Sequence, residues 1–304
     1  MLPPWLPRNG TGRTLTEHMA EHDHDHDDLQ SVLDEERDLM NFYAPYYRSS
    51  CLFNNYYYER ERSLFVDWMM RVVRESGGDP QAMSYLDVGS ATGEILELLS
   101  DRGCASLTGI DIAEEMLSES NHRSITGVRL IHGAIEHHDF GDDRFDVITS
   151  CLTVHHMFDQ GAFFRAVDRI LAPGGWFFIL EYNGTGWGHR PWTGKPLEWL
   201  LVPLRRAIKI KNRSVLARLP PIPPRFNHAH KLLSYRDILN AMPGPARYRV
   251  TRYTRGLVLP VFKNALIRES IVDAAFYRMT DALDNVVKPF GAGYMQGVAG
   301  RRVG

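Results

Sequence analysis

Short apolar runs alternate with helix-like stretches between residues 84 and 183. Five runs have the length and composition of buried strands, at 84–88, 106–111, 128–133, 145–151 and 176–181. Helical patterns begin near Glu94, Ala113 and Gln160, and the last of them ends in the proline- and glycine-containing run 171–175. This alternation predicts an α/β fold with a parallel, doubly wound sheet.

Two different patterns precede this core. Residues 1–28 contain several prolines and glycines, then a polar tract from 21 to 28 in which His and Asp alternate between 22 and 27, without apolar periodicity. This composition predicts a disordered tail, to which we assign no function; such a tract can hold a divalent metal but is more often simply solvated. Residues 29–80 follow helical spacing, with Phe65, Met69 and Val73 on one face, and predict two or three helices.

The pattern after residue 183 is less regular. An insertion spans about 184–246 and includes the proline cluster 220–224. Further elements are expected as a helix near 234–242, a strand near 248–255, a helical segment near 263–287 and a last strand near 294–303. The segment 247–304 would thus complete the core that begins at residue 81, and no internal repeat is visible.

Charge and cysteine content exclude several classes of protein. The 304 residues include 35 basic and 37 acidic ones, for a net charge of -2, so no overall positive field favours nucleic acid as a partner. Cys51, Cys104 and Cys151 lie far apart, which argues against a disulfide framework or a zinc finger and fits a reducing cytoplasm. No basic-then-apolar leader and no apolar run of about 18 to 20 residues is present, so we expect a cytoplasmic protein without stable membrane insertion.

The most informative segment is Tyr85-Leu86-Asp87-Val88-Gly89-Ser90-Ala91-Thr92-Gly93-Glu94, an apolar strand that enters a glycine-rich turn and then a helix. Glycines let a backbone approach a ligand closely, so this turn predicts a cofactor cradle. A dinucleotide fingerprint would place its last glycine at position 94, where Glu94 stands, so the spacing weakens the NAD interpretation. Asp111, about twenty residues further on, can bind a ribose diol in either cofactor class.

The chain resembles the class I S-adenosylmethionine (SAM)-dependent methyltransferases, in particular the branch of the ubiquinone/menaquinone and natural-product methyltransferases. Five segments carry the resemblance in order and spacing, at 86–93, 109–117, 145–148, 154–156 and 171–175. The resemblance implies a Rossmann-like sheet of about seven strands, an N-terminal helical lid, a helical insertion after the fifth strand, and SAM as the cofactor.

The resemblance also implies a set of cofactor-binding residues: Asp87, Gly89, Ser90, Ala91, Gly93, Asp111, Ile112, Met116, Glu136, Cys151 and Tyr47. Two positions depart from the family pattern. Ala91 replaces the usual middle glycine, and Ala134 replaces the acid that commonly recognises the adenine amino group, so that Glu136 is the expected substitute. Taken singly, Asp111 could instead cap the following helix, and Asp146 is interpreted as structural.

Three candidate catalytic residues stand at expected strand ends, His155, His156 and Glu181. The carboxyl ends of the strands are the ligand side of such a sheet. An imidazole near its ordinary pKa can take a proton from a hydroxyl acceptor, and Glu181 can accept a proton or steady a developing cation. Each could instead brace the local backbone. The transfer needs no metal.

The remaining candidates concern the acceptor. The tyrosines Tyr46, Tyr47 and Tyr57 would belong to the lid, and Arg60 or Arg62 could pair with the donor carboxylate. The insertion offers Trp187, Trp192 and Trp199 for an apolar cap, and His228 and His230 for the same pocket. Its basic run, Arg205, Arg206, Lys209, Lys211 and Arg213, could meet a membrane surface or an acidic group, or be a solvated helix face.

The sequence thus predicts small-molecule methylation at an O, N or C atom of a partly apolar metabolite, with secondary metabolism as one setting. Two alternatives are a catalytically silent SAM-binding regulatory protein and an RNA or protein methyltransferase; a nicotinamide oxidoreductase fits less well. A homodimer stays open as an assembly state.

Overall fold

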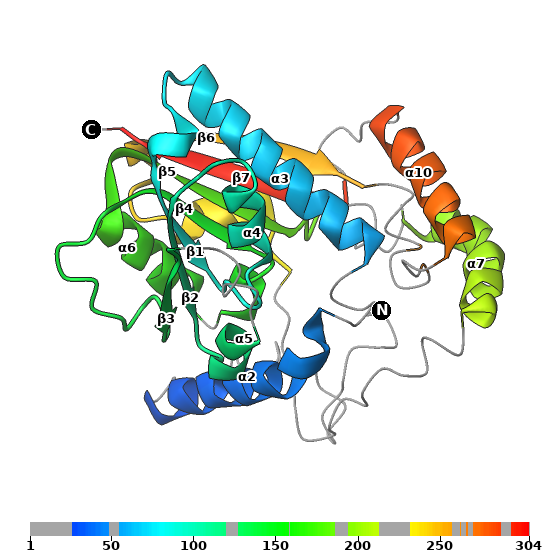
Figure 1. Ribbon diagram of the computed structural model, residues 1–304, viewed down its shortest axis with the longest axis horizontal. Helices are drawn as coiled ribbons and strands as arrows, with labels where there is room; N and C mark the ends of the chain where they lie inside the picture. Colours follow the sequence, from blue (N-terminus) through cyan, green and yellow to red (C-terminus); the bar gives the residue numbers. More distant parts are fainter. Residues whose placement is uncertain are drawn as a thin grey trace.

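One seven-stranded sheet organises the chain. The computed structural model describes residues 26–48, 55–119, 127–157, 159–185, 194–212, 232–256, 262, 266, 270–286 and 293–303, with only the backbone described at 26–30 and 194–199. The sheet order is β3-β2-β1-β4-β5-β7-β6 (Figure 1). The strands are β1 (Ser84–Val88), β2 (Ser106–Asp111), β3 (Arg129–His132), β4 (Phe145–Cys151), β5 (Leu171–Tyr182), β6 (Tyr248–Arg255) and β7 (Met295–Arg302).

The sheet is parallel from β1 to β5, as the alternating pattern predicts, and β7 runs antiparallel to both of its neighbours, β5 and β6. The chain therefore winds outward from β1 in one direction and from β4 in the other. Ligands of such sheets bind at the carboxyl ends of the strands where the order reverses, here between β1 and β4. The expected doubly wound fold is confirmed, and its functional edge is defined.

The expected strands at 84–88, 106–111, 145–151 and 248–255 have the bounds of β1, β2, β4 and β6. The largest difference concerns β5, which begins at Leu171 rather than at residue 176. Leu171 pairs with Phe145, and the register shifts before Val147 pairs with Trp176. The proline and glycines of residues 171–175 therefore end the helix that precedes β5, but β5 still pairs with β4 on both sides of them.

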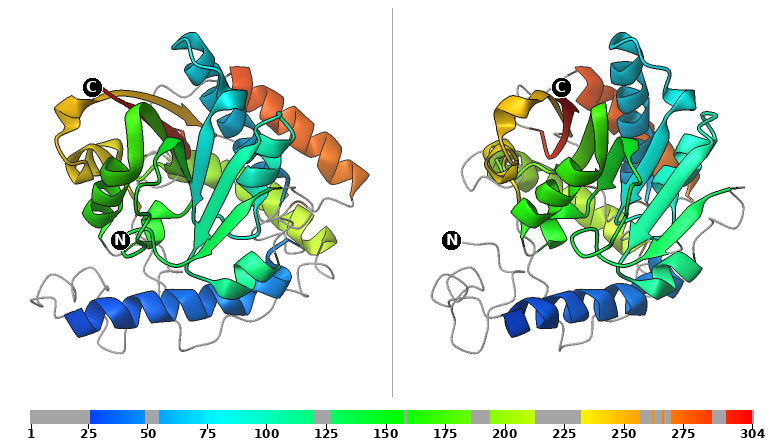
Figure 2. Two further views of the ribbon diagram at one scale, coloured as in Figure 1. Left: turned by 60° about the vertical axis from the view of Figure 1, so that its left-hand side comes forward. Right: turned by 90° about the vertical axis from the view of Figure 1, so that its left-hand side faces the viewer.

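Helices cover both faces of the sheet (Figure 2). They are α2 (His26–Tyr47), α3 (Tyr56–Glu75), α4 (Glu94–Ser100), α5 (Glu114–Ser118), α6 (Gln160–Ile170), α7 (Gly194–Lys211), α9 (Tyr235–Ala241) and α10 (Ile271–Val286), with short 3-10 turns η1 (Pro80–Ala82), η3 (Val154–His156) and η5 (Pro245–Arg247). Helix α7 lies in the predicted helical insertion. Successive strand residues point to opposite faces, so Tyr85 joins the core under α3 and α4 while Leu86 joins the core under α6 and α9.

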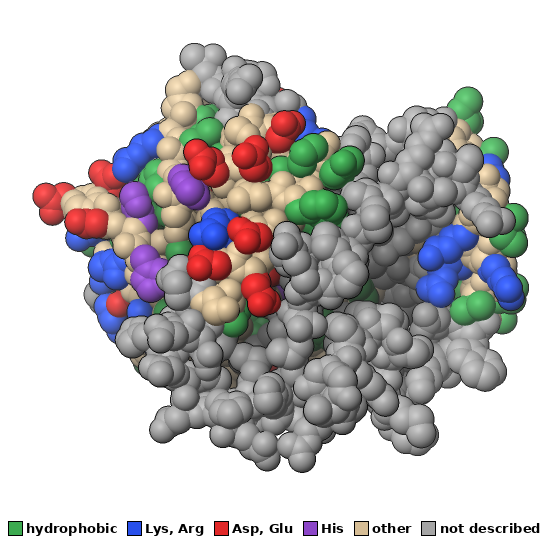
Figure 3. Space-filling view, turned by 90° about the horizontal axis from the view of Figure 1, so that it is seen from below, with side chains coloured by type: hydrophobic (Ala, Val, Ile, Leu, Met, Phe, Trp, Pro, Cys, Tyr) green, Lys and Arg blue, Asp and Glu red, His purple; other side chains and the backbone are tan. Residues whose placement is uncertain are grey.

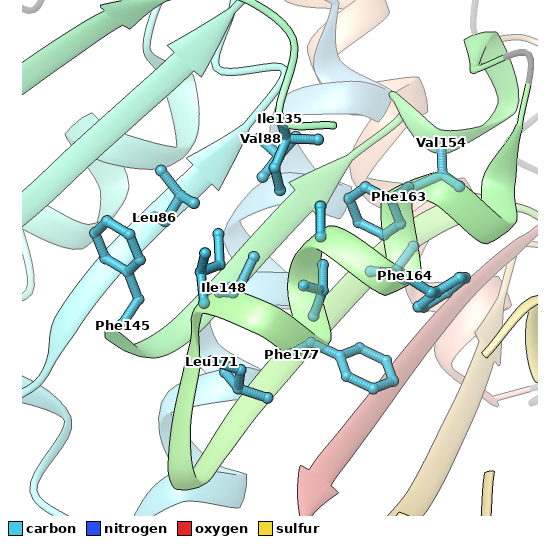
Figure 4. Close-up of a cluster of buried hydrophobic side chains, with 14 of the residues drawn as sticks. Leu86, Val88, Ile135, Phe145, Ile148, Val154, Phe163, Phe164, Leu171 and Phe177 are labelled. Carbon is cyan, nitrogen blue, oxygen red and sulfur yellow. The ribbon is translucent and has the colours of Figure 1, made fainter. Parts of the chain in front are cut away.

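Aromatic side chains fill the second of these cores (Figure 4). Phe164 of α6 and Phe177 of β5 are buried, with ring centroids 5.7 Å apart. Truncating a buried Phe to Ala typically costs about 3–5 kcal/mol of stability. This core fixes β4 and β5, whose carboxyl ends carry the candidate catalytic residues.

Two N-terminal helices precede the sheet, α2 packed on α5 and α3 packed over one face of the sheet. Helix α2 packs Leu39, Tyr43 and Ala44 against Ala113 and Met116 at the start of α5. It begins at His26, inside the segment expected as a tail, whereas residues 1–25 lie outside the described part of the chain. Helix α3 starts at an Asn55 cap, whose Oδ1 accepts hydrogen bonds from two backbone N–H groups. In the described parts of the chain, no helix is long and apolar enough to cross a membrane.

Candidate functional site

The turn after β1 has the conformation that its glycines predict. Gly89, Ala91 and Gly93 all have positive φ, at 69°, 45° and 88°. A side chain on Gly89 would overlap Thr153. Ala91 holds a left-handed conformation that is costly for a residue with a Cβ. It is stabilised by a hydrogen bond from its N–H to Asp111 Oδ2 at 2.8 Å.

Asp111 at the end of β2 links this turn to the next helix. Its second oxygen, Oδ1, accepts a hydrogen bond from the N–H of Ala113, the cap residue of α5, at 2.9 Å. The carboxylate therefore does cap the helix, but it also holds Ala91, and each oxygen has further lone-pair capacity for a ligand hydroxyl. Burial raises the pKa of Asp111 to about 6, against the effect of the two backbone hydrogen bonds.

Acidic groups dominate the surroundings of the turn. Asp87 is buried, accepts a hydrogen bond from Thr149 Oγ1 at 2.7 Å, and has a pKa that burial raises to about 7. The charges of Glu94 and Asp111 raise it further, and Arg62 opposes them. The carboxyl groups of Asp87, Glu94 and Asp111 thus outnumber the single guanidinium, that of Arg62, that acts on Asp87. A cationic sulfonium and ammonium ligand fits this balance, whereas the pyrophosphate of a dinucleotide would meet like charge.

Arg62 and Tyr47 complete the cluster from the two N-terminal helices. Burial alone would lower the pKa of Arg62, but the charge of Glu94 and further contributions from Tyr47 and Cys151 raise it. Burial raises the pKa of Tyr47, and Arg62, Glu94, Cys151 and Asp111 act on it as well. Arg60, the alternative to Arg62, instead pairs with Asp281 of α10 at 3.3 Å. The structure therefore brings Arg62, not Arg60, to the glycine turn.

Not every predicted cofactor residue joins this cluster. Met116 is buried against α2. Ile112 is partly buried, and its carbonyl contacts His132 Nε2 at 3.1 Å. Burial raises the pKa of Glu136; the charge of His137 lowers it and that of Asp159 raises it. Ser90 is buried, and its Oγ has no hydrogen-bond partner among the described residues.

The candidate catalytic residues lie together at the ends of β4 and β5. His155 Nδ1 contacts Glu181 Oε2 at 2.7 Å, and both side chains are almost fully buried. The His155 backbone N–H also donates to Glu181 Oε1 at 3.3 Å. One carboxylate therefore holds both the imidazole and the backbone of η3, which sets the orientation of the ring.

His156 faces the other way, toward α2. Its Nδ1 lies 2.9 Å from Glu36 Oε1, and its ring centroid is 4.0 Å from that of His155. A second link joins Tyr58 of α3 to Tyr182 of β5, whose hydroxyls are 2.7 Å apart. Both N-terminal helices are thus tied by polar contacts to the ligand edge of the sheet.

Sequence reasoning missed Glu36, Tyr58 and Thr149. The run of tyrosines at 56–58 was a signal, but only the phase of α3 after its Asn55 cap decides which ring faces inward. Tyr57 is buried in the core beside Tyr58, and Tyr46 is exposed. Trp187, Trp192, Arg213, His228 and His230 lie outside the described residues, and the side chain of Trp199 is likewise not described.

The sheet order, the glycine turn after β1 and the acid at the end of β2 define the Rossmann-like fold of the class I methyltransferases. Comparisons with known proteins agree with this class. Residues 86–179 match the family described as "Methyltransferase domain". Residues 86–179 therefore form a methyltransferase domain, the class that the motifs predict.

Two curated relatives match the same region. The ubiquinone biosynthesis O-methyltransferase of Bordetella avium (strain 197N) is 30% identical over 124 residues, which cover 40% of this chain and 49% of the relative. The demethylmenaquinone methyltransferase of Staphylococcus aureus (strain MRSA252) is 31% identical over 118 residues, covering 38% and 48%. The chain thus spans about half the length of the curated relatives that it matches.

A solved structure shows the same fold over a longer stretch. The plantazolicin methyltransferase BpumL, in complex with a triazolic desmethylPZN analog and SAH, has a TM-score of 0.50 and 13% sequence identity, and the match covers 92% of this chain and 100% of that one. At this identity the likeness is one of fold. Among the described residues, no group of three or more His, Cys, Asp or Glu side chains could hold a metal ion.

Proposed function

We propose that the protein transfers the methyl group of SAM to an O, N or C atom of a small, partly apolar metabolite. The observation that carries this proposal is the Asp111 carboxylate, which is held by the N–H groups of Ala91 and Ala113 at the carboxyl end of β2. Its position over the glycine turn suits the two hydroxyls of a ribose. When bound, SAM supplies an electrophilic methyl group and leaves as S-adenosylhomocysteine (SAH).

The residues around the turn would bind the donor through charge and shape. Asp111 would accept hydrogen bonds from the ribose hydroxyls, and Asp87 and Glu94 would favour the positive sulfonium and ammonium groups. Arg62 would pair with the donor carboxylate, since it is the buried guanidinium that faces this cluster. The backbone of residues 89–93 would lie against the methionine part; at Gly89 a side chain would overlap Thr153.

We assign the acceptor to the carboxyl ends of β4 and β5. For a hydroxyl acceptor, His155 would take the proton as the bond to the methyl carbon forms, and Glu181 would hold the imidazole through Nδ1 and stabilise the imidazolium. His156 would have a different role, because its partner Glu36 belongs to α2. That contact would close the helical lid of residues 29–80 over the bound pair, and the segment 184–246 would cap the acceptor.

The first experiment is calorimetric titration of the purified protein with SAM, SAH and NAD. We expect micromolar binding of SAM and SAH and none of NAD. Tighter binding of NAD than of SAM would contradict the proposal, because SAM would then not be the cofactor. The second step is methyl transfer from labelled SAM to a panel of quinone precursors, phenols and amines, which includes demethylmenaquinone because of the relatives' names. Binding of SAM without transfer to any panel member would favour the regulatory alternative.

A further inference from the structure

Helix α10 turns most of its apolar side chains outward, although Phe276 and Tyr277 pack inward against the core. Its buried side carries polar residues, with Asp273 at 2% exposure and Thr280 and Asp284 also buried. Its outward side is apolar, with Ile271 at 88% and Val286 at 83% exposure. The same side carries the exposed Val272, Ala275, Met279, Ala282 and Leu283. Surface helices of soluble proteins normally turn this stripe toward the core, so the outward stripe needs a partner.

Helix α7 presents a second apolar stripe on the same side of the molecule (Figure 1). Leu201 and Ile208 pack inward against the core. Leu200, at 75% exposure, and Leu204 lie four residues apart on the outward side, and Ile210 is also exposed near the end of the helix. The two helices are joined at the end of α7, where Lys211 Nζ and Asn212 Nδ2 donate hydrogen bonds to Asp273 of α10 at 2.8 Å and 2.6 Å.

Polar contacts of Arg255 also fix α10 to the body of the protein. Arg255 of β6 bonds Glu61 of α3 at 3.2 Å and both Asp281 and Asn285 of α10, at 3.1 Å and 2.8 Å. These bonds explain the polar side of the helix. They hold the apolar side outward, since turning the helix over would leave buried charges unpaired.

The charge on this surface has one sign. Arg206 and Lys209 are exposed basic residues of α7, and its described side chains from residue 200 to 211 include no acidic one; Arg205 is only partly exposed, and Lys211 pairs with Asp273. Arg278 adds a basic residue to the outward side of α10, whereas Asp273, Asp281 and Asp284 turn inward. Figure 3 shows Lys and Arg side chains beside hydrophobic ones on the side where α7 and α10 lie.

We propose that this surface, the outward sides of α7 and α10, docks on a lipid bilayer that contains anionic phospholipids. Apolar side chains at the level of the acyl boundary and basic side chains at the level of the headgroups are the combination that holds a helix in a membrane interface. A second copy of the chain fits less well, because a two-fold contact through this face would bring its basic residues against one another. The proposal does not rest on methyl transfer.

Flotation of the full chain with vesicles tests the proposal. The two vesicle types are phosphatidylcholine alone and phosphatidylcholine mixed with phosphatidylglycerol. We expect binding to the mixed vesicles, and release as salt is raised. The double variant Arg206→Gln/Lys209→Gln should lower the partition coefficient about tenfold or more. The triple variant Val272→Ser/Met279→Ser/Val286→Ser should lower it at least as much, because it removes the inserted side chains.

Matched controls separate this face from general charge and hydrophobicity. Arg236 and Arg249 are exposed on α9 and β6, and Leu130 is an exposed apolar residue on β3. Arg236→Gln/Arg249→Gln and Leu130→Ser should leave vesicle binding unchanged. Equal binding to both vesicle types, or equal losses in variants and controls, would overturn the proposal. The proposal would also be overturned if light scattering showed a dimer that the α7 and α10 substitutions abolish, while the chain did not bind vesicles. SAM titration of each variant shows that it is folded.

Discussion

The two halves of the molecule bury polar groups by different means. Around β1 and β2, Asp111 is bonded to backbone N–H groups only two and twenty residues away in the chain. Around β6 and α10, Arg255 bonds Glu61 across 194 positions, and Lys211 bonds Asp273 across 62. The donor half therefore needs a local backbone conformation, whereas the outer half needs the completed tertiary structure. Substitutions near β1 and β2 should therefore change SAM binding, whereas substitutions elsewhere should change methyl transfer after SAM has bound.

The largest effect is expected at His155. Replacing it with Gln should lower kcat for a hydroxyl acceptor by about 10²- to 10⁴-fold, because the proton acceptor is lost. SAM affinity should hardly change, since the residue lies at the ends of β4 and β5. The assay is methyl transfer from labelled SAM, combined with calorimetry. The variant His137→Gln, at an exposed histidine, serves as control. If kcat is unchanged in the His155 variant, the contact between His155 and Glu181 only holds η3 in place.

The next effect concerns donor binding. Asp111→Ala should weaken SAM binding by about 100-fold, because hydrogen bonds from two ribose hydroxyls to a buried carboxylate are lost together. The loss should appear in the dissociation constant by calorimetry. Asp143→Ala removes a carboxylate that pairs with Arg129 on the surface and should have no effect. Similar affinities in the two variants would remove Asp111 from the donor site.

The same contrast explains what the sequence could predict. The glycine turn and Asp111 are readable because their contacts are local and their residue types are narrow. The contact of Met116 with α2, by contrast, spans more than seventy positions, and no local pattern encodes it. The antiparallel direction of β7 and the early start of β5 also depend on pairing partners far along the chain.

Local patterns also leave open which side of a helix a given residue turns toward the site. Arg60 and Arg62 are two residues apart on one helix, so the sequence alone left both as partners of the donor. The Asn55 cap fixes the phase of α3 and turns Arg62 to the glycine turn and Arg60 to Asp281. Helix α10 shows the limit of the pattern more sharply, because its apolar stripe would ordinarily be assigned to the core.

The arginine pair gives a smaller effect. Arg62→Gln should weaken SAM binding about tenfold, through loss of one charge-assisted contact to the donor carboxylate. Arg60→Gln should leave the affinity unchanged, although it breaks the contact with Asp281. Calorimetry of both variants decides between them. If the Arg60 variant were the weaker binder, the charge arrangement around the glycine turn would have to be revised.

The smallest effect is a pH dependence of donor binding. Asp87 and Asp111, with pKa values raised by burial to about 7 and about 6, are partly protonated in the free protein at pH 6.5. A cationic ligand favours their ionised forms and lowers both pKa values, so SAM binding should release protons. Affinity should therefore fall severalfold as pH drops from 7.5 to 6, within the limit of about tenfold per pH unit for each proton released.

The sign of the proton exchange distinguishes the two cofactor classes. Calorimetry at pH 6.5 in buffers of different ionisation enthalpy measures the protons released per bound ligand. A pyrophosphate beside the same carboxyl groups would raise their pKa values, so a dinucleotide would bind with proton uptake. Asp87→Asn and Asp111→Asn should each reduce the release on SAM binding, because each removes one titrating group. Release unchanged in both variants would mean that the protons come from elsewhere and that these two carboxyl groups do not face the donor's positive charge.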